Sequence, residues 1–212
     1  ILDMGHRRMA LVKELAGEAG DLLDLGCALG PFLEAARQTG WNPYGVDISQ
    51  SAVDYVKSKL KLPALASDLL IFDPQSEFGQ DKFDALTMWY VIEHIPQLDA
   101  LLNKVNSLLK PGGLFAFSTP NGAGISARKN QHAFLCDGPE DHFLVFNPWK
   151  LQGLCRQYGF KLERIVVTGH HPERFPLVGK SPSLGPVIGC VSRSAGLGDT
   201  FEAYWRKIGE PL

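Results

Sequence analysis

Two carboxylates and a glycine turn near the start of the chain have the types and spacing of a nucleoside-binding site. Asp24 lies in an apolar run that enters the turn Gly26 to Gly30, and Asp47 follows 21 residues after Gly26 at the end of a second apolar run. Glycines let a ligand approach the backbone, and an acid at the end of the next strand can accept hydrogen bonds from ribose hydroxyls. Because Pro31 suits the first turn of a helix, the pattern predicts a strand, a turn, a helix and a second strand that together hold a nucleoside.

The residues of the turn discriminate between nucleoside ligands. The dinucleotide fingerprint G-x-G-x-x-G would need glycine at positions 28 and 31, where the chain has Ala28 and Pro31. The carboxylate of Asp24 would repel a pyrophosphate, whereas it would attract a ligand that carries an ammonium and a sulfonium. A nucleotide-linked oxidoreductase therefore stays only as a disfavoured alternative, which preference for a dinucleotide in a binding assay would reveal.

Residues 24–30 resemble the first motif of class I S-adenosylmethionine-dependent methyltransferases, D-x-G-x-G-x-G, with Ala28 in place of the middle glycine. Three further segments resemble later parts of the same family in the same order. Residues 67–70 are similar to the adenine-binding acid and its neighbour, 82–95 to the fourth strand and its loop, and 108–118 to the Pro-Gly-Gly turn and fifth strand. The resemblance implies an α/β fold: a Rossmann-like, doubly wound, mostly parallel seven-stranded sheet with an antiparallel last strand.

The resemblance also implies S-adenosyl-L-methionine as cofactor, with S-adenosyl-L-homocysteine as product. Asp24 would line the methionine end, Asp47 the ribose and Asp68 the adenine. The residues expected to bind the cofactor are Asp24, Gly26, Cys27, Gly30, Asp47, Ile48, Asp68, Leu69 and Trp89. A plain core role is an equal alternative for the tryptophan. Arg7 or Arg8 could reach the methionine carboxylate, although a solvated pair of charges is the simpler interpretation.

A narrower resemblance concerns residues 140–160, where a histidine and aromatic residues precede a helix that ends at Gly159-Phe160. This is similar to the subgroup that includes ubiquinone-biosynthesis O-methyltransferases and many small-molecule, sugar and lipid methyltransferases. A sulfonium already activates its methyl group, so the protein must position the acceptor, exclude water and, for an alcohol or phenol, remove a proton. A neutral histidine suits that task. His142 is the first candidate base and His94 the second, and each could instead hold its loop by bonding a backbone carbonyl.

Composition excludes several classes of protein. The chain has 212 residues, of which 45% are hydrophobic, and we expect a single domain over residues 1–212. Its net charge is −2 with no block of like charges, so we expect no nucleic-acid partner. No apolar stretch is long enough to span a membrane. The four cysteines are far apart without a C-x-x-C pair, which favours a cytoplasmic protein with no disulfide framework and no metal site.

Alternating apolar patterns predict further strands and helices around the site. Helices are expected at Met9–Ala19, Ala52–Leu60, Leu98–Leu109 and 148–158, and the last two strands at Lys161–Thr168 and Val187–Ser192. Two segments fall outside this pattern, 119–145 and 169–186. Both follow strands and should lie at the carboxyl edge of the sheet, where ligands bind. We expect them to form a lid over the acceptor, with ordinary surface loops as an equal alternative.

The expected function is methyl transfer from S-adenosylmethionine to a small-molecule or conjugated acceptor, with oxygen favoured over nitrogen and carbon. The Asn-Pro-Pro-aromatic signature of amino-group methyltransferases is absent, since the chain reads Met88-Trp89-Tyr90-Val91 there. A non-catalytic binding module that keeps the fold is the alternative, and Ala28 supports it. Turnover separates the two, because both can bind the cofactor and only an enzyme consumes it.

Overall fold

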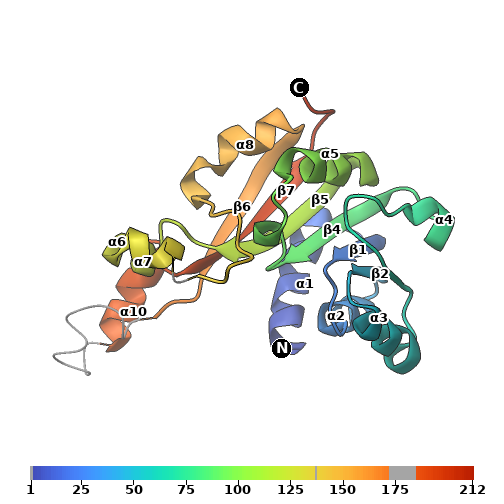
Figure 1. Ribbon diagram of the computed structural model, residues 1–212, viewed down its shortest axis with the longest axis horizontal. Coiled ribbons are helices and arrows are strands. Elements are labelled where there is room, and N and C mark those ends of the chain that lie inside the picture. The colour runs from blue at the N-terminus through green and yellow to red at the C-terminus, as the bar shows by residue number, and fades with distance from the viewer. Residues whose placement is uncertain (1, 137, 172–184) are drawn as a thin grey trace.

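The computed structural model describes residues 2–136, 138–171 and 185–212, and it contains one seven-stranded sheet in the order β3-β2-β1-β4-β5-β7-β6 (Figure 1). The strands are β1 (Asp21–Leu25), β2 (Asn42–Asp47), β3 (Ala64–Ala66), β4 (Phe83–Trp89), β5 (Leu109–Pro120), β6 (Phe160–Thr168) and β7 (Thr200–Lys207). Strands β1 to β5 pair in parallel, while β7 runs antiparallel to both β5 and β6. The expected doubly wound sheet with an antiparallel last strand is confirmed.

Helices cover both faces of this sheet, with α5 and α8 on one face and α1, α2 and α3 on the other (Figure 1). The helical segments of the described residues are α1 (Leu2–Ala16), α2 (Pro31–Gln38), α3 (Gln50–Tyr55), the π-helical η1 (Val56–Leu60), α4 (Pro74–Phe78), the 3-10 turn η2 (Ile92–His94), α5 (Leu98–Leu108), α6 (Ile125–Lys129), α7 (Gln131–Cys136), the 3-10 turn η3 (Pro148–Lys150), α8 (Leu151–Gln157) and α10 (Gly185–Ser194). None of these helices is long and apolar enough to cross a membrane.

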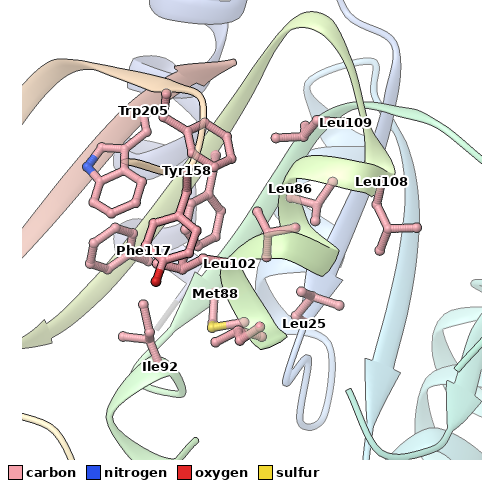
Figure 2. Close-up of a cluster of buried hydrophobic side chains, with 14 of the residues drawn as sticks. Leu25, Leu86, Met88, Ile92, Leu102, Leu108, Leu109, Phe117, Tyr158 and Trp205 are labelled. Atoms are coloured by element: carbon pink, nitrogen blue, oxygen red, sulfur yellow. The ribbon is translucent and has the colours of Figure 1, made fainter. Parts of the chain in front are cut away.

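The larger hydrophobic core lies between the sheet and the helices α5 and α8 (Figure 2). Several of its aromatic side chains meet edge to face, as where the ring centres of Phe117 and Trp205 lie 5.1 Å apart at 89°. A second cluster packs Met9 and Val12 of α1 and Phe32 of α2 against the opposite face. Because dense packing on both faces fixes the strands, the loops at their carboxyl ends begin from fixed positions.

Side-chain hydrogen bonds cap the first turns of two helical segments. The Ser49 hydroxyl accepts a hydrogen bond from the N–H of Ala52, 3.3 Å away, at the start of α3. The side chain of Asn147 accepts one from the N–H of Trp149 at 3.0 Å, ahead of η3 and α8. Each cap satisfies an N–H that has no partner within its helix.

The predicted strand Val187–Ser192 is wrong, because these residues belong to the helix α10. Val187 and Val191 are exposed there, by 61% and 53%, so their β-branched side chains do not line a sheet. The strand position is taken by β7, in which six of the eight residues are buried. A strand between two others in a covered sheet needs such a continuous buried run, and only the later segment supplies one.

The first helix and the segment 119–145 also differ from what the sequence predicts. The first helix begins at Leu2 rather than Met9 and ends at Ala16, where Gly17 adopts a φ of 89° and its N–H bonds the carbonyl of Lys13. The segment 119–145 is not a plain loop, since it contains α6 and α7. Most of the other expected lid segment, residues 172–184, lies outside the described residues.

Candidate active site

The turn after β1 brings the backbone close to the pocket. Gly26 has a φ of 80°, and its N–H donates to the carbonyl of Val46 at 2.7 Å. A Cβ on Gly26 would lie 2.4 Å from Cγ2 of Val91, so only glycine fits. Gly30, with a φ of 75°, is the residue from which α2 begins. The turn therefore has the tight shape that the sequence predicts.

The carboxylate of Asp47 bonds both the glycine turn after β1 and the loop after β2. One of its carboxylate oxygens accepts the N–H of Ala28 at 2.8 Å and the other accepts the N–H of Ser49 at 2.9 Å. An ionised carboxylate has about four acceptor positions, so two positions remain for a ligand. Ala28 adopts a φ of 47°, a left-handed conformation that costs a residue with a Cβ about 1–2 kcal/mol.

A cavity of about 700 Å³ runs along the carboxyl ends of β1, β2 and β4. Five expected cofactor residues lie together in its wall beside Gly26: Asp47, Ile48, Asp68, Leu69 and Trp89. Ile48 is 80% exposed, and the carboxylate of Asp68 accepts the N–H of Leu70 at 2.7 Å. We call it the nucleoside cavity, because its carboxylates and apolar wall suit ribose hydroxyls and a flat base.

A smaller cavity of about 120 Å³ adjoins it around Asp24. Asp24 is buried and accepts a hydrogen bond at 2.7 Å from the hydroxyl of Thr87. Burial raises the pKa of the Asp24 carboxyl to about 7, and the Thr87 hydrogen bond and the charge of Arg8 oppose that rise. We call this the methionine cavity, after the part of the cofactor that Asp24 is expected to line. A cationic group in it would restore the ionised form of Asp24, so the cavity fits an ammonium.

Arg8 lies in the same wall and is buried, so the interpretation of Arg7 and Arg8 as a solvated pair is wrong for Arg8. Its Nε donates to Glu202 at 2.8 Å, and its guanidinium carbon lies 4.1 Å from the ring centre of Trp89. The sequence carries a signal for this position, because Arg8 falls on the buried stripe of α1 with Gly5, Met9 and Val12.

Three other residues expected to bind the cofactor occupy different positions relative to the two cavities. Cys27 is buried in the wall of the methionine cavity, and burial raises the pKa of its thiol. Gly30 lines neither cavity and serves the turn alone. Trp89 lies in the walls of both cavities, in contact with Phe32 at 5.1 Å between ring centres.

The two histidine candidates lie side by side. His94 ends η2, His142 lies between α7 and η3, and their ring centres are 4.7 Å apart at 80°. Nδ1 of His94 is 3.1 Å from the backbone carbonyl of Asp141 and 3.1 Å from one of its carboxylate oxygens, so His94 does bond a backbone carbonyl as the alternative expects, and both residues line the nucleoside cavity. Burial and, next, the charge of His94 lower the pKa of His142, so this ring is neutral near pH 7.

Glu93 lies directly behind the histidines. The residue is 1% exposed, its Oε2 has no hydrogen-bond partner among the described residues, and burial raises the pKa of its carboxyl. Glu93, His94 and His142 each offer a ligand atom, all within 4.8 Å of one another. A divalent cation could be held by such a set, so the expectation of no metal site stays a prediction for a chelation experiment.

The sequence pattern of a family described as a methyltransferase domain matches residues 3–165. The chain belongs to this methyltransferase family. The resemblance to class I S-adenosylmethionine-dependent methyltransferases is thereby confirmed, and with it S-adenosylmethionine as the methyl donor. The match spans α1 to β6, so both cavities and the two histidines of this methyltransferase lie inside it.

Similar proteins agree with this membership. The methyltransferase is 27% identical over 169 residues to a ubiquinone biosynthesis O-methyltransferase of Colwellia psychrerythraea, covering 71% of this chain and 67% of that protein. A second protein of that name, from Nitrosococcus oceani, is 26% identical over 80% of this chain and 76% of its own length. The crystal structure of a methyltransferase from Archaeoglobus fulgidus superposes with a TM-score of 0.69 at 17% identity, covering 98% and 95% of the two chains.

Proposed function

We propose that this methyltransferase transfers a methyl group from S-adenosylmethionine to an oxygen atom of a small-molecule or conjugated acceptor. The observation that carries the proposal is the pair of adjoining cavities at the carboxyl edge of the sheet. One holds Asp24 and Arg8, and the other holds Asp47 and Asp68. Together they offer complementary groups to a ligand with a zwitterionic end and a nucleoside end.

The methionine cavity suits an amino acid head group. The carboxylate of Asp24 would bind the ammonium. Arg8 uses Nε for Glu202 and Nη2 for the hydroxyl of Ser118, and among the described residues Nη1 makes no hydrogen bond, which leaves donors for the ligand's carboxylate. Trp89 would pack against the ligand between the two cavities, and Asp47 would bind the ribose hydroxyls.

S-adenosylmethionine, when bound, supplies a methyl group on a sulfonium that needs no further activation. We propose that His94 removes the acceptor's proton and that His142 packs against it. The sequence places His142 first, but His94 and Asp141 line the cavity and His142 does not. With Nδ1–H donated to the backbone carbonyl of Asp141, Nε2 of His94 keeps its lone pair for the acceptor hydroxyl.

Oxygen as the target is supported by the names of the O-methyltransferases that match at 26–27% identity. The acceptor of those proteins is not carried over, because the resemblance is distant. We propose further that residues 1–212 act as a single domain in the cytoplasm. The four cysteines are all free, which agrees with a reducing compartment.

Titration calorimetry with S-adenosylhomocysteine tests the cofactor site, with Asp47→Ala as the variant expected to abolish binding. Turnover is then measured as S-adenosylhomocysteine release over a panel of phenols and alcohols. His94→Gln should lower kcat by about 10²-fold, the contribution of a general base, without changing cofactor affinity. His132→Gln is the control, since that histidine lies on α7 and lines neither cavity.

Each outcome separates the two candidate functions. Binding with no turnover on any acceptor would favour the non-catalytic binding module, and no binding in the unmodified protein would refute the cofactor site. Turnover of His94→Gln within about threefold of the unmodified protein, far less than a base contributes, would refute the role of His94.

A further inference from the structure

A third cavity, of about 610 Å³, opens between α1, the end of β4 and the ends of β6 and β7. It shares Met4 and Arg8 with the methionine cavity and Tyr90 with the nucleoside cavity. The sulfur of S-adenosylmethionine joins the methionine to the nucleoside. A cavity that borders both halves of the cofactor site therefore lies where the transferable methyl group would be.

Tyr90 is held at this junction by an unusual backbone. Its φ is 58°, and its N–H donates to the carbonyl and to the hydroxyl of Ser118, at 3.0 and 3.1 Å. Such a conformation is costly for a residue with a large side chain and is found mainly where surrounding structure imposes it, often at functional sites. The ring is 39% exposed, and it lines the third cavity beside Arg8.

Positive charge dominates the wall of this third cavity. Arg7 and Arg8 contribute to it, and Glu202 is the one carboxylate among the described residues that line it. Glu202 is already neutralised by Arg8 at 2.8 Å, and its second oxygen accepts the hydroxyl of Tyr204. Within the described part of the chain Arg7 makes no ion pair, so its charge is uncompensated.

A fourth cavity, of about 530 Å³, continues from the third around the edge strand β6. The two share Arg7, Val166, Thr168 and Gly169. Arg193 adds a second guanidinium to the wall of the fourth cavity, and none of the described residues that line it is a carboxylate. Arg7 thus stands between two connected cavities that both favour negative charge.

We propose, on the basis of the function proposed above, that the acceptor is an anion and that Arg7 binds its carboxylate or phosphate group. The guanidinium presents donors in a planar fork that matches either group in a bidentate way. The hydroxyl that receives the methyl would lie beside Tyr90, which the third cavity shares with the nucleoside cavity that His94 lines, and the anionic group would reach toward the fourth.

Calorimetry on the protein saturated with S-adenosylhomocysteine tests this with three phenols of similar size. The probes are 4-hydroxyphenyl phosphate, 4-hydroxybenzoate and the neutral 4-hydroxybenzyl alcohol. We expect at least one anion to bind about tenfold more tightly than the alcohol, which is the effect of one strong charge-assisted contact. The stronger of the two anions identifies the group that the cavity prefers.

Arg7→Gln should remove this preference, and Arg7→Lys should retain part of it. Arg156→Gln is the matched control, because Arg156 is an exposed arginine on α8 that lines neither cavity. Equal binding of the three probes, or an unchanged preference in Arg7→Gln, would overturn the proposal. Loss of S-adenosylhomocysteine binding in the unmodified protein would refute the proposed function instead, and the anion preference can then still be measured on the free protein.

Discussion

Cofactor affinity should depend on pH through the buried carboxyl of Asp24. The folded protein holds the pKa of this group at about 7, because burial penalises the charge. A bound ammonium favours the ionised carboxylate, so at low pH binding must first expel a proton from Asp24. Affinity should therefore fall as the pH is lowered through 7.

The size of the effect follows from the pKa. With a pKa of about 7, Asp24 is about 90% ionised at about pH 8 and about 10% ionised at about pH 6. The affinity for S-adenosylhomocysteine should then fall about tenfold over this range, equivalent to about 1.4 kcal/mol. Calorimetry at closely spaced pH values measures it directly, and proton uptake or release appears in buffers of different ionisation enthalpy.

Asp24→Asn provides the control. This variant cannot ionise, so its affinity should be low and nearly independent of pH over the same range. Although the variant should bind the cofactor weakly, its folded state should be more stable than that of the wild type at alkaline pH. A carboxyl whose pKa is raised on folding makes the folded protein less stable as pH rises from the unfolded value toward 7, so Asp24→Asn should have the higher Tm at alkaline pH. A wild-type affinity that stays flat with pH, or a variant that keeps the same slope, would refute the assignment of Asp24 to the ammonium.

Three further predictions concern the turn and the histidine cluster. Ala28→Gly should raise stability by about 1 kcal/mol in urea unfolding, because glycine adopts a φ of 47° without strain; an unchanged midpoint would contradict the strain argument. Gly26→Ala should weaken S-adenosylhomocysteine binding at least about tenfold, because its Cβ would displace Val91; affinity equal to the wild type would show that the turn can relax. Dialysis against a chelator should leave turnover within about twofold, well below the effect of losing a catalytic group; a loss that Zn²⁺ restores would instead assign Glu93 and its two neighbouring histidines to a cation.

The parts of the fold and site that the sequence predicts depend on short-range patterns. The turn at Gly26, the acid Asp47 and the cap Ser49 all act on residues close to them in the chain, or at the end of an adjacent strand. Their chemistry can therefore be deduced from spacing alone. The expected cofactor residues come together because the parallel strands end at one edge of the sheet.

The missed features depend on partners far away in the sequence. Arg8 falls on the buried stripe of α1, but its ion-pair partner Glu202 lies 194 residues later and cannot be deduced from local spacing. The run Val187–Ser192 has strand-like residue types, and only the competition with β7 for the place beside β5 shows that it is not a strand. Asp141 precedes His142 in the chain, but the loop geometry places its carboxylate against Nδ1 of His94. Such pairings need tertiary structure.

The position of β7 has a consequence for how the protein is made. β6 joins the sheet only through β7, and β7 also supplies the Glu202 that holds Arg8 in the methionine cavity. A nascent chain that has not yet released residues 200–207 from the ribosome would have four parallel pairings in place, but neither the edge strand nor a positioned Arg8. Competence to bind cofactor would therefore arise only once residues 200–207 have left the ribosome, and the nascent chain would have to shield the bare side of β5 until then.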